Sequence, residues 1–340
     1  MILVLNCGSQ SIKWKLFDDK LKPLKRNKVA VLNSQEYQNI LEQELEKLSK
    51  EGISVIGHRV VHGVGAFKGP IKITDEVIQR LERKNYLAPL HNPYNILGIR
   101  ACQKTFFDKP NFAVFDTDFF ADLPEVTQIY AIPEDARREF GFRRYGFHGT
   151  SHECVAREAA KKIRKPFEKL RIITCHLGGG SSISAIKNGK AIDTSMGFTP
   201  MEGLVMMTRA GNVDAGVVLE LAREFGLEKT DEILNKESGI KGICGESEML
   251  KVLSKMKKGD KKAKLAFDIF VYSIKKYIGA YFAVLGGCDV LVFTGSVGVG
   301  DPATRKAVCK NLNILGKFKV LSIETDEELA IAQKIITLGK

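Results

Sequence analysis

The sequence predicts an α/β protein built from two related halves, each with a sheet flanked by helices. Short apolar runs typical of strands alternate with helical patterns along the chain. The segment His176-Leu-Gly-Gly-Gly-Ser181 aligns without a gap with Asn6-Cys-Gly-Ser-Gln-Ser11, and each separates two strand patterns, which indicates an internal duplication. The length of 340 residues suits two domains better than one.

The first half begins with a predicted hairpin. We expect strands at residues 2–6, 12–17 and 28–32, a helix over 36–49, a buried strand over the β-branched run 53–61, a helix that starts at Asn92-Pro93, and a strand at 111–115.

The second half repeats this plan after a helix start. Thr150-Ser-His-Glu153 is a capping-box pattern that opens a helix to about residue 163. The expected elements that follow are strands at 172–175 and 182–186, a helix at 262–285, a strand at 289–293, a helix at 302–313, a strand at 318–323 and a final helix.

The composition and the cysteine pattern indicate in which compartment the protein is expected. No run of 18 apolar residues predicts a membrane span, and residues 1–5 are typical of a first strand, not of a signal peptide. The 7 cysteines are dispersed without a C-x-x-C pair, which favours free thiols in a reducing compartment. We therefore expect a cytoplasmic protein with no membrane partner.

The net charge of +12 does not by itself indicate a nucleic-acid partner. Lysine and arginine are interleaved with 40 acidic residues, and only residues 255–262 form a local basic run. Its simplest interpretation is a solvated connection between helices. We favour an anionic small substrate over nucleic acid.

Three glycine clusters are candidates for phosphate binding, because backbone amides beside glycine can surround a phosphate. They are the two hairpin turns near residues 8 and 178–180 and the segment 294–300, which follows an apolar strand. None matches the Walker pattern or the G-x-G-x-x-G pattern before a helix. Ordinary hairpin turns remain the alternative interpretation for the first two.

Two arginines and one aspartate are candidates for binding a small anion. Arg59 and Arg209 lie among glycines and small residues, where a guanidinium can grip a carboxylate or phosphate through two hydrogen bonds. A structural ion pair is an equally good interpretation of either arginine. Asp116 ends an apolar strand and either faces a ligand or caps a helix.

The two H-x-x-x-H pairs have a spacing that could suggest zinc on a helix, but His58 and His62 fall on a predicted strand and His148 and His152 straddle a helix start. Neither pair matches H-E-x-x-H, so a histidine metal site is not expected.

Taken together, seven motifs resemble the acetate and propionate kinases, which belong to the actin-like (ribonuclease H-like) superfamily with sugar kinases, Hsp70 and actin. In order along the chain they are Leu5-Asn-Cys-Gly-Ser-Gln-Ser11, Gly57-His-Arg-Val-Val-His-Gly63, Leu87-Ala-Pro-Leu-His-Asn-Pro93, Phe115-Asp-Thr117, Arg144-Tyr-Gly-Phe-His-Gly-Thr-Ser-His152, Asp193-Thr-Ser-Met-Gly-Phe-Thr-Pro200 with Glu202-Gly203, and Glu327-Glu-Leu-Ala-Ile-Ala332.

The resemblance implies a two-domain actin-like fold with duplicated mixed sheets flanked by helices. It implies an N-terminal domain over 1–120, onto which a C-terminal helix at 328–340 packs, and a nucleotide-binding domain over 121–327. The implied reaction is reversible phosphoryl transfer from ATP to acetate with Mg²⁺ or Mn²⁺, by a homodimer. Three alternatives remain. The acid could be propionate or butyrate, the phosphate donor could be GTP or pyrophosphate, and the protein could be a degenerate nucleotide-binding paralogue without turnover.

Residue by residue, the resemblance implies four groups of site residues. The catalytic group is Asp116, His148 and Arg209; the substrate-binding group is Arg59, Val61, Leu90, His91, Phe147 and Pro200; the nucleotide-binding group is Lys13, His176, Leu177, Gly178, Gly179, Gly180, Ser296, Val297 and Gly298; and the metal group is Asn6 and Glu327.

Departures from the family pattern lie on the nucleotide side. Gly179 stands where the family has asparagine, and residues 296–300 replace the family's Gly-Ile-Gly-Glu-Asn. The segment 245–250 lacks an adenine-flanking arginine, unless Lys251 replaces it. We therefore expect the base to be discriminated less strongly than is usual in the family.

Overall fold

The computed structural model describes residues 1–340 except 32, 66, 90 and 339–340. The chain forms two compact units. The described residues of 1–121, 147–154 and 326–340 make up the first unit, and 122–146 with 155–325 make up the second. Within the described part of the chain, none of the helices has the length and apolar content needed for a membrane span.

The first unit contains a mixed six-stranded sheet in the order β3-β2-β1-β4-β6-β5. The strands β1, β2 and β3 form an antiparallel meander, while β4 and β6 continue the sheet in parallel with β1. Their bounds are β1 (Ile2–Gly8), β2 (Ser11–Phe17), β3 (Pro23–Ala30), β4 (Val55–Val60), β5 (Ile71–Lys72) and β6 (Asn111–Phe115).

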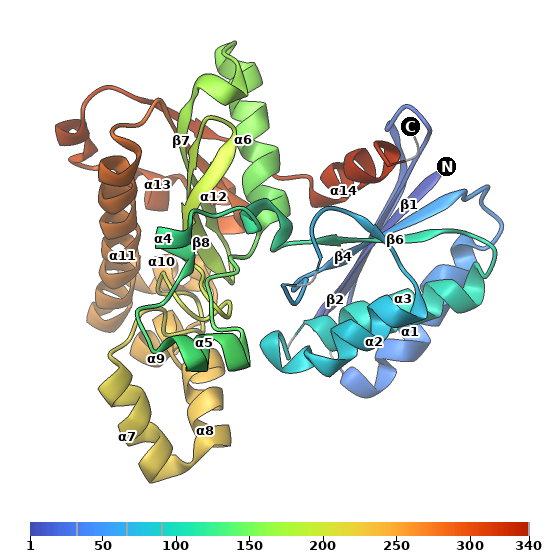
Figure 1. Ribbon diagram of the computed structural model, residues 1–340. Helices are drawn as coiled ribbons and strands as arrows, with labels where there is room; N and C mark the ends of the chain where they lie inside the picture. Colours follow the sequence, from blue (N-terminus) through green and yellow to red (C-terminus); the bar gives the residue numbers. More distant parts are fainter. Residues whose placement is uncertain (32, 66, 90, 339–340) are drawn as a thin grey trace. The chain divides into compact units, whose positions relative to one another are not determined.

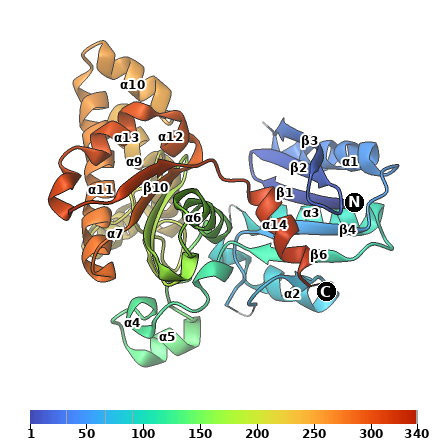
Figure 2. The ribbon, with the colours of Figure 1, turned by 90° about the horizontal axis from the view of Figure 1, so that it is seen from above.

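Helices cover both faces of this sheet (Figure 1). On one face, α1 (Tyr37–Leu48) and α3 (Asn92–Thr105) bury the side chains of β1 and β2 that alternate toward them, and α2 (Asp75–Arg83) packs on α3. On the other face, α14 (Glu327–Ile336) lies across β1, β4 and β6, as Figure 2 shows from above. Ile331 and Ile335 of α14 pack against Val4 and Val114, so the start of α14 is held beside the sheet.

The second unit repeats the strand plan. Its five-stranded sheet has the order β11-β10-β7-β8-β9, with β7, β8 and β9 antiparallel and β10 and β11 parallel to β7. The bounds are β7 (Arg171–Leu177), β8 (Ser181–Lys187), β9 (Lys190–Thr194), β10 (Val290–Thr294) and β11 (Lys319–Ser322). In both sheets three antiparallel strands precede parallel ones, which is the duplication that the two glycine turns predict.

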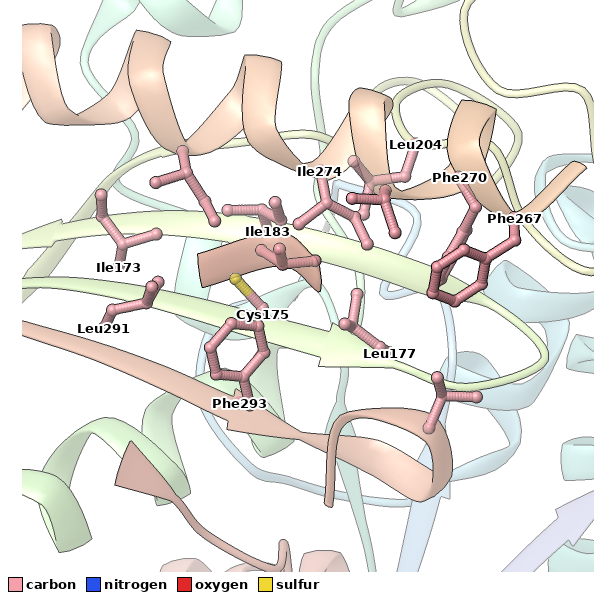
Figure 3. Close-up of a cluster of buried hydrophobic side chains, with 14 of the residues drawn as sticks. Ile173, Cys175, Leu177, Ile183, Leu204, Phe267, Phe270, Ile274, Leu291 and Phe293 are labelled. Carbon is pink, nitrogen blue, oxygen red and sulfur yellow. The ribbon is translucent and has the colours of Figure 1, made fainter. Parts of the chain in front are cut away.

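A long helix supplies one wall of the second core. Residues of α11 (Lys261–Leu285) such as Phe267, Phe270 and Ile274 pack against Ile173 and Ile183 of the sheet (Figure 3). Helix α11 begins at the cap Asp260 and ends at Gly286, which has a left-handed backbone that favours glycine.

The remaining helices are α4 (Glu125–Gln128), α5 (Glu134–Phe140), α6 (Gly149–Ile163), α7 (Ala215–Phe225), α8 (Leu227–Glu232), α9 (Gly239–Cys244), α10 (Met249–Lys257), α12 (Gly295–Gly300) and α13 (Pro302–Cys309). Shorter helical turns are η1 (Ser34–Glu36), η2 (Asn85–Leu87), η3 (Asp118–Phe120), η4 (Phe167–Lys169), η5 (Ile233–Glu237) and η6 (Leu312–Leu315). The α/β class with duplicated mixed sheets flanked by helices is thus confirmed. The expected helix at 302–313 is shorter, because α13 ends at Cys309 and Asn311 adopts a left-handed backbone.

Candidate active site

A buried ion pair lies at the carboxyl edge of the first sheet. The guanidinium of Arg59, on β4, donates from Nη2 to Oδ2 of Asp116 at 2.6 Å and from Nε to both carboxylate oxygens at 3.1 Å. Asp116 directly follows β6, and its backbone N–H donates to the carbonyl of Val60. Because β4 and β6 are adjacent and parallel, their ends bring the two side chains together.

Burial and charge pull the pKa values of this pair in opposite directions. Burial raises the pKa of Asp116 above the ordinary carboxyl value, and the charge of Arg59 opposes that rise. Burial lowers the pKa of Arg59, but the charges of Asp116 and Glu327 outweigh it and hold the pKa above the usual range. The Asp116 side chain is 1% exposed, whereas that of Arg59 is 18% exposed. Arg59 is therefore the member of the pair that a ligand can reach.

The start of α14 adds two carboxylates beside Arg59. Nη1 of Arg59 lies 3.5 Å from a carboxylate oxygen of Glu327 and 3.4 Å from Oδ1 of Asn6. The amide of Asn6 donates to Glu328 at 3.5 Å. The sequence singled out Asn6 and Glu327 as metal ligands but not Glu328. Glu328 could have been found from its position, because it also lies in the first turn of α14, the end of a helix that favours negative charge.

These side chains fit the donor requirements of a magnesium ion only in part. Mg²⁺ prefers oxygen donors and is commonly held by one or two carboxylates together with substrate phosphates. The amide oxygen of Asn6 and the carboxylate of Glu327 are such donors. Among the described residues no group of three or more His, Cys, Asp or Glu side chains forms a metal centre. The donor set therefore suits a cation that arrives with a phosphate ligand.

Two lysines on β2 lie on the face that α14 covers. Lys13 is the cross-strand neighbour of Asn6. Lys15 points to the same face as Lys13, because strand side chains alternate, and its ammonium binds both carboxylate oxygens of Asp326 at 2.7–2.8 Å. Asp326 caps α14 through the N–H of Leu329. The sequence missed Lys15, which secures the helix that carries Glu327.

The segment with Phe147 and His148 is fixed to Asp116 by backbone contacts. The N–H of Gly149 donates to the carbonyl of Asp116 at 2.8 Å. A Cβ at Gly149 would lie 2.3 Å from that oxygen, so only glycine permits the approach. His148 has a φ of 59°, a left-handed conformation that is uncommon outside glycine. The bond from Gly149 holds the backbone of the preceding residue, His148, close to the backbone of Asp116.

The predicted apolar positions of the first unit are partly described. Val61 and Phe147 are buried, and Phe147 packs edge-on against His62 with ring centroids 5.4 Å apart. The N–H of Val61 donates to the side chain of the buried Asn95 on α3. His91 is half-buried and directly precedes α3. Leu90 lies outside the described residues.

In the second unit, the glycine hairpin borders a cavity of about 360 Å³. Gly178 and Gly179 form one side, and Ser296 and Val297 of α12 form another. The remaining lining residues are Met207, Ser247, Glu248, Met249, Leu250, Gly300 and Asp301. The side chain of Leu177 lies instead in the hydrophobic core, and His176 is half-buried on β7.

The family resemblance placed the 245–250 segment on the nucleotide side, but the sequence missed Met207 as a cavity residue. No local pattern marks Met207, whose N–H donates to the carbonyl of Gly179 at 3.3 Å in the folded chain. Lys251, the possible replacement for the arginine, is exposed and pairs with Glu248 at 2.6 Å. A Cβ at position 179 would meet no heavy atom within 4 Å, so the glycine is not required here by a close contact.

Arg209 and Pro200 lie together in the second unit. Nη1 of Arg209 donates to the carbonyl oxygen of Pro200 at 3.4 Å. Arg209 is half-buried, and this burial lowers its pKa. The sequence grouped the two residues only through the family resemblance.

A polar network beneath Pro200 was not predicted. Tyr130 donates its hydroxyl hydrogen to Glu202 and accepts the N–H of Phe198 at 2.8 Å. Arg144 donates to Glu202 at 2.7 Å and to the backbone carbonyl of Thr194 at 3.1 Å. These bonds fix the 194–202 segment, which carries Pro200.

Comparison with known proteins identifies the family. The model of the acetokinase family matches residues 25–334. Acetate kinase of Helicobacter acinonychis is 43% identical, and the alignment covers 97% of each chain. Acetate kinase of Carboxydothermus hydrogenoformans is 41% identical, over 99% of this chain and 98% of the relative.

Solved structures agree with this assignment. Acetate kinase of Porphyromonas gingivalis has a TM-score of 0.90 at 38% identity and covers 100% of this chain and 99% of its own. A propionate kinase from Francisella tularensis has a TM-score of 0.91 at 36% identity, with 98% of both chains covered. A ROK hexokinase from Thermus thermophilus shares only the fold, with a TM-score of 0.52 at 11% identity over 99% of both chains. The resemblance stated from the motifs is confirmed, and the chain belongs to the acetokinase family.

Proposed function

We propose that this protein is a carboxylate kinase that transfers the γ-phosphoryl group of ATP reversibly to acetate, giving acetyl phosphate and ADP. The observation that carries the proposal is the reachable arginine held by a buried carboxylate, with Asn6 and Glu327 beside it. Asp116 occupies two donors of Arg59 and leaves Nη1 beside Asn6 and Glu327. Such an arginine is suited to bind a carboxylate or a phosphoryl group.

In this proposal the side chains position the reactants and neutralise charge, and none forms a covalent intermediate. Arg59 binds the carboxylate of the acid, and Asp116 orients Arg59. His148 and Arg209 stabilise the charge that develops on the transferring phosphoryl group. Asn6 and Glu327 hold Mg²⁺ or Mn²⁺, which when bound neutralises phosphate charge. The nucleotide is bound by Lys13, by His176 to Gly180 of the hairpin and by Ser296 to Gly298 of α12.

Trapping of the acyl phosphate tests the proposal directly. The protein is incubated with ATP, Mg²⁺ and hydroxylamine, together with acetate, propionate or butyrate, and the hydroxamate is measured. We expect acetate to be the best acceptor. If propionate were turned over faster than acetate, propionate would replace acetate as the proposed substrate, in line with the propionate kinase from Francisella tularensis. A folded protein that forms no hydroxamate with any of the three would refute the kinase proposal.

The size of the acid should depend on Val61. We propose that Val61 and Phe147 line the site of the acid's alkyl group, to which the family resemblance also assigns Pro200 and Leu90. Val61→Ala should raise kcat/KM for propionate relative to acetate by about tenfold, because one methylene in an apolar pocket is worth about 1–3 kcal/mol. The matched control is Val60→Ala, which removes the same atoms from the neighbouring buried valine. An equal shift in both variants would place Val61 in the core and not in the pocket.

The nucleotide base should be discriminated weakly. The cavity beside the glycine hairpin has an apolar part formed by Met207, Met249, Leu250 and Val297. Of its two acidic residues, Glu248 pairs with Lys251, and Asp301 caps α13 through the N–H of Ala303. A base held by shape and apolar contact loses little free energy when it is exchanged. We expect kcat/KM for GTP within about tenfold of that for ATP at saturating acetate, and detectable use of pyrophosphate. Lys251→Ala, which alters an exposed pair, should leave the ATP-to-GTP ratio unchanged, and a strong ATP preference would contradict the prediction.

We also propose that the protein forms a homodimer. Helix α7 has no buried residue among those described, and Val217, Leu219 and Phe225 of this helix are each about half exposed. Several large apolar side chains exposed on one helix are typical of a protein interface. Leu219→Glu should convert the dimer into a monomer in sedimentation velocity, whereas Glu220→Gln on the same helix should not. A wild-type protein that sediments as a monomer at micromolar concentration would exclude the dimer.

A further inference from the structure

A second, larger cavity lies in the second unit, between the end of α10, the start of α11 and the start of α13. Its volume is about 810 Å³, compared with about 360 Å³ for the cavity at the glycine hairpin. Helix α11 contacts both α10 and α13, and all three are labelled in Figure 2. The basic run at residues 255–262, interpreted from the sequence as a solvated connection, supplies much of its rim.

Two of the three lysines on this rim have no partner of opposite charge among the described residues. Lys257, Lys261 and Lys264 line the cavity. Lys264 pairs with Asp268, but the ammonium groups of Lys257 and Lys261 have no ion pair or hydrogen bond in the part of the chain that the structure describes.

The carboxylates that line the cavity are already engaged. Asp260 accepts the N–H groups of Lys262 and Ala263 at the start of α11. Asp301 is buried, accepts the N–H of Ala303 at 2.9 Å and accepts the hydroxyl hydrogen of Thr304. Both carboxylates keep their negative charge, but they accept backbone N–H groups as helix caps and, within the described residues, form no ion pair with Lys257 or Lys261. The rim therefore offers two ammonium groups that an anion can pair with.

The floor of the cavity is apolar. Leu253 and Met256 of α10 face Pro302 and Ala303 of α13, and the aliphatic stems of the lysines add further apolar surface. A bare inorganic anion would leave this surface in water, and a neutral hydrocarbon would leave the ammonium groups without a partner. The chemistry that satisfies both is an amphipathic organic anion, and the volume is within the range of small-molecule sites.

We propose that this cavity binds an amphipathic organic anion, with its alkyl body against Leu253, Met256 and Pro302 and its anionic group at Lys257 and Lys261. The site is separate from the one at the hairpin, to which the proposed function assigns the nucleotide. Asp301 lines both cavities, and α10 runs from one to the other, since Met249 and Leu250 line the first and Lys257 lines the second. The two sites are therefore neighbours with a shared wall.

Isothermal titration calorimetry with octyl phosphate, below its micelle-forming concentration, tests the proposal. Octyl glucoside carries the same alkyl chain without the charge, and inorganic phosphate carries the charge without the chain. We expect octyl phosphate to bind at least about tenfold more tightly than either, because only it combines apolar burial with charge-assisted contacts.

The same basic run offers a matched pair of variants. Lys257→Ala/Lys261→Ala removes two lysines that line the cavity, and Lys258→Ala/Lys262→Ala removes two exposed neighbours that do not. The first variant should weaken octyl phosphate about tenfold, and the second should leave binding within about twofold of the wild type. Met256→Glu should weaken binding as well, through loss of the apolar floor.

Three results would overturn the proposal. They are equal weakening by both lysine pairs, binding of inorganic phosphate or octyl glucoside as tight as that of octyl phosphate, and complete loss of octyl phosphate binding at saturating ATP, which would place it in the cavity at the hairpin. Circular dichroism of each variant confirms folding. Calorimetry does not depend on turnover, so a protein that binds octyl phosphate through Lys257 and Lys261 but makes no acyl phosphate would refute the kinase proposal alone.

Discussion

Replacement of Arg59 by alanine should lower kcat/KM for acetate by roughly 10²–10³, the loss typical of removing one oriented charge from an active site. The variant should also be less stable than the wild type. Asp116 is almost fully buried, and without Arg59 its carboxylate would remain in the interior with no partner of opposite charge. Breaking a buried pair from one side costs about 3 kcal/mol in free energy of unfolding.

Two further variants separate the catalytic loss from the stability loss. Arg59→Ala/Asp116→Asn removes the stranded charge, so it should recover part of the stability while turnover stays low. Arg171→Ala removes an arginine that pairs in the same bidentate manner with Asp289 in the second unit, at a more exposed site. It should cost about 1 kcal/mol or less and leave kcat/KM unchanged. Denaturant unfolding and steady-state kinetics measure both quantities, and near-normal turnover in a folded Arg59→Ala protein would remove Arg59 from the mechanism.

The elements that the sequence predicted well are those whose signal is local. The hairpin before and after Gly8 and the hairpin around Gly178–Gly180 follow from alternating apolar residues on both sides of a glycine turn. Helix α3 begins at Asn92, where the Asn-Pro pair predicted a start, and strand β6 has the expected bounds. The order of strands within each sheet required pairing between distant segments, and a single sequence carries no direct record of such pairs.

The same limit applies to the site. Arg59 and Asp116 were each singled out, with a structural ion pair left as an equal alternative for the arginine. The structure shows such a pair, but its partner could not be predicted, because the two residues are 57 positions apart and meet only through the register of β4 and β6. The pairing gives Asp116 a positioning role through Arg59, in place of direct exposure to a ligand. Its catalytic assignment from the family resemblance stays a prediction.

Polar contacts between residues far apart in the sequence were the part of the site that could be predicted least. Lys15 binds Asp326 across 311 positions, and Tyr130 and Glu202 are 72 positions apart. Lys15, Asp326 and Tyr130 carry no recognisable pattern in their own segments, and the family motif that contains Glu202 does not indicate its partner. Only the helix α14 motif and the segment before Pro200 carried a recognisable pattern, so the side chains that support them appeared only with the folded structure.

Replacement of Arg209 should have an effect of similar size but a different signature. The Arg209 side chain is half-buried and donates from Nη1 to the carbonyl of Pro200, and burial lowers its pKa. A desolvated arginine interacts strongly with developing phosphoryl charge, because little water is present to screen it. If Arg209 acts mainly in the transition state, Arg209→Ala should lower kcat and kcat/KM equally, by roughly 10²–10³, and leave KM for acetate nearly unchanged.

Two control variants separate the effect of the charge of Arg209 from the effect of its planar guanidinium and from a general effect of losing an arginine. Arg209→Lys keeps the charge but not the planar fork, so it should recover only part of the turnover. Arg157→Ala removes an arginine that packs over the ring of Phe167 at 4.8 Å, in the same unit, and should leave kcat unchanged. A rise in KM at constant kcat would show that Arg209 binds the ground state and the transition state alike. Unchanged kinetics in folded Arg209→Ala would show that the charge on the phosphoryl group is neutralised by other residues, with Arg59 and His148 as the candidates that remain.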